Sequence, residues 1–486
     1  MSQHDDRLKN RAFNSVVWKF AERICAQGVS LTVSIVLARK LMPEDYSVVG
    51  IVAIFFAFCN IFISGGLNSS LIQKKNAETE DYSTVLYLNL LVAGLLYGVI
   101  FSCAPWIARI YDKPQLVAIF RVMGLTFFAN AFKSVLSAYV SSSLNFKRFF
   151  LSTIIGTVTS AVVGLALAYR GMGPWALVAQ EMTNTIMDTV ILYLSTRMKI
   201  VRVFSLERIK SLFGYGWKIM ASSMISVIYD QISPLIVGLK FTPADLAYYN
   251  KGSSFPGLIN NTISDTLASV LFPVMAKVQD EKEDVLNITR RYVKVASYVI
   301  FPLMVGLFAV SDSFVRVLLT EKWLPAAPYI RIFAVSYMFN LIQVGNLQAI
   351  KAIGRSDITL VLEVLKKGIY FALIAAFVFF AEDPKTFAFS TIGCTAVALA
   401  VNTFPNQKLL GYYYRYQLAD ILPNLMISLV MGAVVMMMGG LPISMYLLLP
   451  LQVLAGVVIY VCLSVLTRNE NFRYMLGFMM QYLKRG

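Results

Sequence analysis

The sequence contains few charges and almost no histidine. Only 14% of its 486 residues are charged, against about 25% in a typical soluble domain. Its one histidine, His4, lies in a polar N-terminal stretch, which argues against a histidine-based catalytic centre or metal site. The cysteines have neither CxxC nor metal-ligand spacing, so we interpret them as packing residues; they are Cys25, Cys59, Cys103, Cys394 and Cys462.

The N-terminal stretch also does not have the pattern of a cleavable signal peptide. The first apolar stretch carries Lys19, Glu22 and Arg23, whereas a signal peptide has an uninterrupted apolar core and a cleavage site with small residues. We therefore expect the N-terminus to be retained.

Apolar residues dominate the chain instead. They make up 57% of it, and the mean hydropathy is +0.66. Because a bilayer core is crossed by about 20 apolar residues in a helix, the pattern predicts an all-α integral membrane protein with about fourteen transmembrane helices. We place them at 13–38, 46–68, 83–108, 116–141, 150–169, 173–195, 215–239, 245–276, 292–312, 326–349, 356–381, 386–406, 420–440 and 443–466.

The net charge of +16 is concentrated in alternate loops between these runs. Cytoplasmic loops of membrane proteins carry an excess of lysine and arginine, and the alternation predicts that both termini are cytoplasmic. This explains the basic balance better than a nucleic-acid partner does. The longest such connection, 195–214, is predicted to lie as an amphipathic segment on the membrane surface.

The chain also shows an approximate internal repeat with an offset of about 200 residues, seen in the pairs Trp18–Trp217, Pro43–Pro243 and Asp45–Asp245. Transporters are often built from such repeats, with the substrate site between the halves. We predict an N-terminal lobe of six helices at 1–205 and a C-terminal lobe of six at 206–410. Two extra helices follow at 411–467, and a cytoplasmic interfacial tail at 468–486.

Several charged residues fall inside the predicted helices, where each base costs roughly 2.5–3.5 kcal/mol at the helix centre. Such residues usually face a bundle interior or a hydrated cavity. The spacing of Glu181 and Asp188, with Asn184 between them, places all three on one helix face. The predicted substrate-cavity residues are Lys19, Glu22, Arg23, Arg121, Lys133, Lys218, Lys251 and Arg331, and the candidate ion-coupling residues are Glu181, Asp188, Asp230 and Asp265.

Other interpretations of these residues stay open. Lys19, Lys218 and Lys251 lie near helix ends and could extend to lipid headgroups. Glu181 and Asp188 could neutralise cavity bases or take up a coupling proton or sodium ion. The excess of bases favours an anionic cargo such as a diphosphate or an acidic sugar, and no other cofactor or metal is expected.

Four segments carry a family resemblance: VLARKLMPEDYSVVGIV, GGLNSSLIQKK, LFPVMAKVQDEKE and EKWLPAAPYIRIFAV. The chain resembles Wzx-type polysaccharide flippases of the multidrug/oligosaccharidyl-lipid/polysaccharide (MOP) exporter superfamily, and within it the colanic-acid and teichuronic-acid exporter branch. The resemblance implies two six-helix lobes around a cavity, plus two C-terminal helices.

The resemblance further implies transport of a polyprenyl-diphosphate-linked oligosaccharide from the cytoplasmic to the outer leaflet of the bacterial cytoplasmic (inner) membrane. The implied partners are that glycan, membrane lipids and, as candidates, a polysaccharide polymerase and glycosyltransferases. Two rivals are a lipid II flippase of cell-wall synthesis and a multidrug or toxin antiporter of the same superfamily. A membrane-embedded glycosyltransferase is disfavoured, because the outer loops are short and no carboxylate motif is visible.

Overall fold

The computed structural model describes residues 25–64, 66–74, 77–143, 145–276, 278 and 280–483. Within these ranges 88% of the residues are helical and no strand occurs. The prediction of an all-α protein is thereby confirmed. By contacts the chain divides into two compact units, Met1–Ala247 and Tyr248–Gly486.

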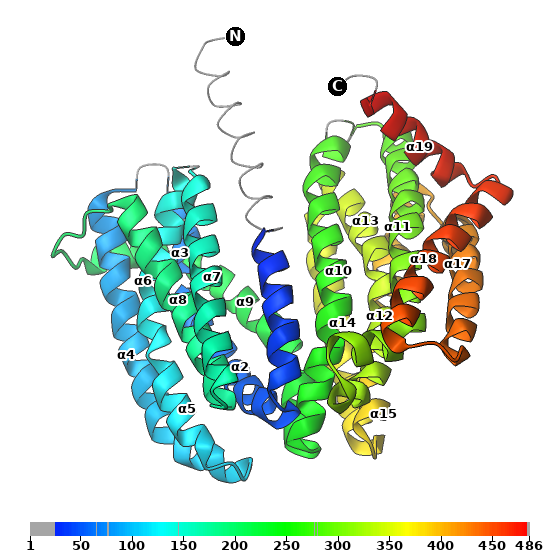
Figure 1. The fold of residues 1–486 in the computed structure, drawn as a ribbon. Coiled ribbons are helices and arrows are strands. Elements are labelled where there is room, and N and C mark those ends of the chain that lie inside the picture. Colours follow the sequence, from blue (N-terminus) through cyan, green and yellow to red (C-terminus); the bar gives the residue numbers. More distant parts are fainter. Residues whose placement is uncertain are drawn as a thin grey trace. The chain divides into compact units, whose positions relative to one another are not determined.

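The first unit contains the helices that precede residue 241 (Figure 1). Its first helix is described from residue 25 to residue 40. The others are α2 (Pro43–Ser64), α3 (Leu67–Gln73), α4 (Thr79–Ile110), α5 (Gln115–Gly124), α6 (Thr126–Ser142), α7 (Lys147–Tyr169), α8 (Pro174–Thr196) and α9 (Leu206–Lys240). Since α9 packs against α2 and α3, the division falls after this helix. The division into repeat-related lobes at 1–205 and 206–410 remains a prediction.

The second unit begins in the first turns of α10. Its last three helices, α17, α18 and α19, each pack against α11 and are coloured orange to red in Figure 1. The elements are α10 (Pro243–Ala276), α11 (Lys282–Leu318), η1 (Glu321–Ala326), α12 (Ala327–Met338), α13 (Asn340–Ala352), α14 (Ser356–Phe380), α15 (Pro384–Ala388), α16 (Ser390–Leu410), α17 (Tyr414–Met437), η2 (Met438–Gly440), α18 (Met445–Leu466) and α19 (Glu470–Leu483).

The predicted apolar runs from residue 46 onward lie in helices, although α9 and α11 begin nine and ten residues before their runs, and four runs consist of two consecutive helices each. These are α2 with α3, α5 with α6, α12 with α13, and α15 with α16. Among the described residues, nine helices are long and apolar enough to cross a membrane. The chain is therefore a multi-pass membrane protein, and the number fourteen remains a prediction.

The connection between α8 and α9 consists of a non-helical segment and the first turns of α9, and its location on the membrane surface remains a prediction. Residues 197–205 are not helical, and α9 starts at Leu206 and continues without a break to Lys240. The connection is fastened to α4: Val201 donates its backbone N–H to Ser83 Oγ at 3.0 Å, and Thr84 Oγ1 donates to the Val203 carbonyl at 3.4 Å. These two hydrogen bonds to α4 satisfy the Val201 N–H and the Val203 carbonyl, which are therefore paired although residues 197–205 are not helical.

Candidate functional site

In the first unit, three predicted charged residues gather between α6 and α8. Lys133 Nζ lies 2.6 Å from Asp188 Oδ2. Glu181, two turns earlier on α8, lies within the electrostatic influence of Lys133 and is exposed on the surface of the unit. The cluster contains one base and two acids, and a proton or a monovalent cation could balance its second carboxylate.

The sequence of α8 explains why these charges share a side. Glu181 and Asp188 are seven residues apart and point in nearly the same direction, whereas Val190 points to the opposite side. Ile186, Val190 and Leu194 form an exposed apolar stripe there. The helix therefore has one lipid-compatible face and one charged face.

Glycine allows α7 to approach the charged face closely. A Cβ atom on Gly156 would lie only 3.2 Å from both Cβ and the backbone nitrogen of Asp188. Small residues at such contacts let membrane helices pack closely. On the other side Asn130, one turn before Lys133, donates to Asn60 Oδ1 of α2 at 3.0 Å. The cluster thus lies between α6 and α8 with α7 packed against Asp188, and α2 is bonded to α6 one turn away.

The remaining predicted residues of the first unit lie apart from this cluster. The guanidinium carbon of Arg121 lies 4.0 Å from the centre of the Phe101 ring, in a cation–π contact between α5 and α4. Its Nε is buried and has no hydrogen-bond partner among the described residues. Lys218 and Asp230 are exposed on α9.

In the second unit the predicted residues Arg331 and Lys251 contact other residues of the same unit. Arg331 donates from Nε to Ser311 Oγ at 2.7 Å and from Nη2 to Asp312 Oδ2 at 2.5 Å. Lys251 is only 8% exposed, and its ammonium lies 5.7 Å from the Trp323 ring and 5.9 Å from the Phe255 ring. The tryptophan of the EKW segment therefore packs near a buried base.

Four predicted residues cannot be placed. Lys19, Glu22 and Arg23 lie outside the described residues, and Asp265 lies on α10 at a position whose side chain is not described. Within the described part of the chain, no group of three histidine, cysteine, aspartate or glutamate residues could hold a metal ion.

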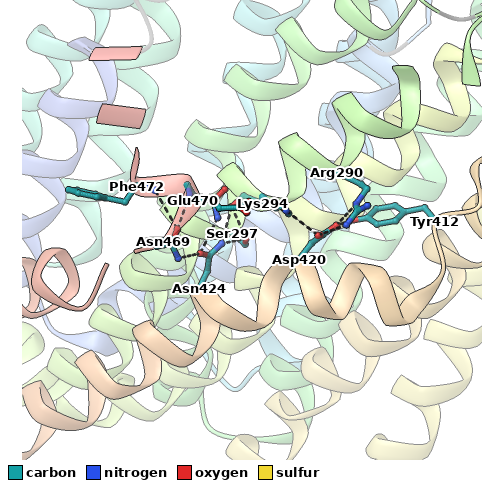
Figure 2. Close-up of polar contacts among 10 residues, drawn as sticks. Arg290, Lys294, Ser297, Tyr412, Asp420, Asn424, Asn469, Glu470 and Phe472 are labelled. Carbon is teal, nitrogen blue, oxygen red and sulfur yellow. Dashed lines mark hydrogen bonds and ion pairs between the residues drawn. The ribbon is translucent and has the colours of Figure 1, made fainter. Parts of the chain in front are cut away.

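A second charged cluster, which the sequence analysis did not identify, joins α11 to α17 (Figure 2). Asp420 is 5% exposed and accepts hydrogen bonds from Arg290 Nε and Nη2 at 2.8 and 2.9 Å. Tyr412 Oη donates to the same carboxylate at 2.9 Å, and Lys294 Nζ lies 3.6 Å from it. Burial and the nearby Asp420 carboxylate raise the pKa of Tyr412. The sequence signal was weak, a single acid at the start of an apolar run.

Asn424, one turn after Asp420, connects this cluster to the C-terminal helix (Figure 2). Its Nδ2 donates to the Lys294 carbonyl and to Ser297 Oγ on α11, at 3.0 and 2.8 Å. Its Oδ1 accepts from Asn469 and Asn471 at 3.0 and 3.3 Å. The arrangement fixes the start of α19 to α11 and α17.

A buried amide network lies deeper in the same unit. Asn346 Nδ2 donates to Gln417 Oε1 at 3.0 Å and to Thr403 Oγ1 at 3.3 Å, while Asn406 Nδ2 donates to Asn346 Oδ1 at 2.8 Å. All four side chains are buried. Paired amides of this kind bind membrane helices together, here α13, α16 and α17.

Ionic contacts also hold the start of α9. Arg208 Nη1 lies 2.8 Å from Asp81 Oδ1, and Arg208 Nη2 lies 2.9 Å from Glu78 Oε2 and 2.6 Å from Glu80 Oε2. Lys74 Nζ contacts the other Asp81 oxygen at 2.7 Å. Hydrogen bonds with Asp81 and Glu78 raise the pKa of Arg208, which stays charged in any case.

Comparison with known proteins identifies relatives at the sequence level. The chain is 24% identical to the succinoglycan biosynthesis transport protein ExoT of Rhizobium meliloti, over 66% of this chain and 65% of that protein. It is 26% identical to the teichuronic acid biosynthesis protein TuaB of Bacillus subtilis, over 62% and 63%. These alignments cover slightly less than two thirds of the relatives. The lipopolysaccharide biosynthesis protein WzxC of Escherichia coli is 23% identical over 88% and 89%.

Solved structures share the fold. The lipid II flippase MurJ, in its inward closed conformation, superposes with a TM-score of 0.76 and 15% identity, covering 94% of this chain and 99% of that one. An inward-facing multidrug resistance transporter of the MATE family gives a TM-score of 0.61 and 14% identity, covering 79% and 94%. That transporter belongs to the MOP superfamily, and the two likenesses confirm the predicted all-α membrane fold.

A family match covers most of the first unit and part of the second. A family model described as "Polysaccharide biosynthesis protein" matches residues 36–328. This range includes three of the four segments that carried the resemblance and about half of the fourth. The chain belongs to the polysaccharide biosynthesis protein family.

Proposed function

We propose that the protein moves a polyprenyl-diphosphate-linked oligosaccharide repeat unit from the cytoplasmic to the outer leaflet, for surface polysaccharide synthesis. The observation that carries the proposal is a MurJ-like fold over 94% of the chain, in a family described by polysaccharide biosynthesis. Relatives named for succinoglycan, teichuronic acid and lipopolysaccharide synthesis favour a glycan cargo.

The charged face of α8 supports transport of a polar headgroup through the membrane. Lys133, Asp188 and Glu181 lie on helices α6 and α8, which carry no other charged residue, and intramembrane charges usually line a pathway. Arg121 adds a second base at membrane depth. The glycan head would pass along such residues while the polyprenyl tail stays in lipid, and alternating access would expose the head on each side in turn.

The proposal includes a coupling ion, a location and partners. A proton or sodium ion would couple through Glu181 and Asp188, and no other cofactor is involved. The protein would lie in the bacterial cytoplasmic membrane with both termini in the cytoplasm, beside a polysaccharide polymerase and glycosyltransferases. It would act as a transporter and not as an enzyme, in line with the transporters that share its fold.

Lipid II is a second candidate cargo, favoured by the high structural similarity to MurJ. At 15% identity this likeness concerns the fold, whereas the sequence relatives are named for surface polysaccharides. A multidrug antiporter is less well supported, since the MATE transporter superposes with a lower TM-score of 0.61.

The test measures export in cells that lack the gene. We expect these cells to lose the surface polysaccharide and to accumulate its lipid-linked repeat unit in the cytoplasmic leaflet, while lipid II transport continues. The wild-type gene restores export, and Lys133→Ala reduces it at equal membrane abundance. Lys199→Ala, which removes an exposed base in the 197–205 connection, serves as the control. Unchanged polysaccharide in the deletion strain, or a block in lipid II transport, would contradict the proposal.

A further inference from the structure

The first unit contains an apolar pocket between the α2–α3 junction, α4 and α9. Its volume is about 250 Å³. The lining consists of Phe62, Ile63, Gly66 and Leu67, then Leu88, Asn89 and Val92, and finally Phe213, Gly216 and Met220. None of the residues in the charged cluster of α6 and α8 contributes to it.

The lining excludes water as the natural occupant. Asn89 supplies the only polar side chain among the lining residues, and its amide nitrogen is directed at Ser134 Oγ, 3.5 Å away. A buried water needs two to four polar partners, and an apolar cavity of about 150 Å³ stays dry and binds benzene. The pocket is therefore suited to a hydrocarbon group.

The pocket is deep on one side and open on another. Ile63 and Asn89 are 1% and 2% exposed, whereas Phe62 and Phe213 are 43% and 47% exposed. One wall is formed by direct contact of two backbones, since a Cβ atom on Gly66 would lie 2.3 Å from the Gly216 carbonyl oxygen. Entry is therefore lateral, past the two phenylalanine rings.

Its depth is that of the cytoplasmic half of the bilayer. Leu88–Val92 lie five to nine residues after residue 83, where the predicted apolar run within α4 begins, which at about 1.5 Å per residue corresponds to roughly 8–14 Å along the helix. The hydrocarbon core extends about 15 Å from its midplane, and the predicted topology puts the starts of α4 and α9 at the cytoplasmic face. The ion pairs of Arg208 with Glu78, Glu80 and Asp81 connect the start of α9 to the start of α4 on the cytoplasmic side of the pocket. A ligand would therefore enter the pocket from the lipid side.

We propose that this pocket binds a segment of the polyprenyl chain of the transported lipid in the cytoplasmic leaflet. The inference rests on the proposed function, which places the substrate in that leaflet before transport. The pocket would hold the tail at α4 and α9 and so position the attached head for entry.

The experiment uses full-length protein in phospholipid vesicles and a polyprenyl-diphosphate-linked sugar that carries a photoactivatable diazirine in its chain. Mass spectrometry locates the adducts. We expect adducts on 62–67, 88–92 and 213–220. Val92→Trp fills the pocket and should reduce labelling about tenfold, which corresponds to a loss of about 1.4 kcal/mol of binding. The control is Leu91→Trp, because Leu91 is adjacent in α4 but 56% exposed and outside the lining.

Met220→Trp fills the pocket from α9 and replaces Val92→Trp if that variant fails to fold, as judged by its thermal unfolding. Labelling that is equal in the filled variants and in wild type would overturn the proposal. So would a diazirine phosphatidylethanolamine that labels the same peptides and is not displaced by unlabelled polyprenyl diphosphate. Pocket labelling in a protein that exports no glycan in cells would instead refute the proposed function and leave the site intact.

Discussion

Arg290 and Asp420 form a two-point ion pair between α11 and α17. Nε and Nη2 of the guanidinium donate to the two carboxylate oxygens, at 2.8 and 2.9 Å. Parallel hydrogen bonds of this kind fix the orientation of both groups as well as their separation. The pair therefore sets how the C-terminal helices dock on α11.

Replacing Asp420 with asparagine should destabilise this docking. The substitution keeps the side-chain shape but leaves Arg290 and Lys294 without their buried counter-charge, and hydrogen bonds to charged groups contribute about 1.5–3 kcal/mol. A fall in the detergent-solubilised protein's unfolding temperature, with faster proteolysis at 411–420, is the expected result. Arg355→Gln breaks an exposed pair with Asp357 and should change neither measurement. Equal stability of the two variants would show that the ion pair is dispensable.

Lys133 and Asp188 should be energetically coupled. Asp188→Asn or Lys133→Met alone leaves an uncompensated group on the charged face, so each lowers stability and glycan export. The double variant removes both charges, and its effect should fall below the sum of the single effects by about 0.5–3 kcal/mol. The measurement is a double-mutant cycle of unfolding free energies, with export assayed in parallel. Strict additivity of the two substitutions would mean that the 2.6 Å contact contributes nothing.

Gly66→Ala should loosen the contact between α9 and the α2–α3 junction. The new methyl group would lie 2.3 Å from the Gly216 carbonyl oxygen, a backbone atom that cannot move alone, and overpacking typically costs about 1–3 kcal/mol. Thermal unfolding measures this loss.

The matched control for Gly66 is Gly94→Ala in α4. A Cβ atom there meets nothing within 4 Å, and alanine favours the helix by roughly 1 kcal/mol over glycine. Opposite signs for the two substitutions are expected, and a stabilising Gly66→Ala would contradict the packing described for these helices.

The stability of the N-terminal cap that Asp383 provides for α15 should depend on pH. Its carboxylate accepts the backbone N–H groups of Lys385 and Thr386 at 2.8 and 2.9 Å, and hydrogen bonds from Thr386 lower its pKa below the usual value. Because the ionised form is favoured in the folded state, the cap contributes fully above pH about 4. The contribution is lost as the pH falls through the lowered pKa.

Hydrogen exchange at the amides of Lys385 and Thr386 measures that cap. Exchange should be protected at pH 6, after correction for the intrinsic rate, and less protected at pH 3. Asp383→Ala should be unprotected at both pH values, with a cost of about 1 kcal/mol for the lost cap. Protection that does not depend on pH in the wild type would rule out the carboxylate as its source.

Helix periodicity places charged residues on a face of one helix but does not identify their partners on another helix. The phase of Glu181 and Asp188 on one side of α8 follows from a period of 3.6 residues, and the structure has this arrangement. That Lys133 is the partner of Asp188, or that Arg121 stacks on Phe101, depends on how helices distant in sequence pack. Asp420 was missed for the same reason, since its three polar partners come from α11 and from residue 412.

The sequence by itself determined the helical membrane fold and the positions of the apolar runs. These properties are local, because a run of about 20 apolar residues satisfies its own backbone as a helix in lipid. The tertiary structure decided which charges pair, that α9 packs with the first unit, and where an apolar pocket remains between helices. Each of these depends on contacts between different helices, some of them more than 100 residues apart in sequence, such as Arg208 with Asp81 and Arg290 with Asp420, and no local periodicity specifies such contacts.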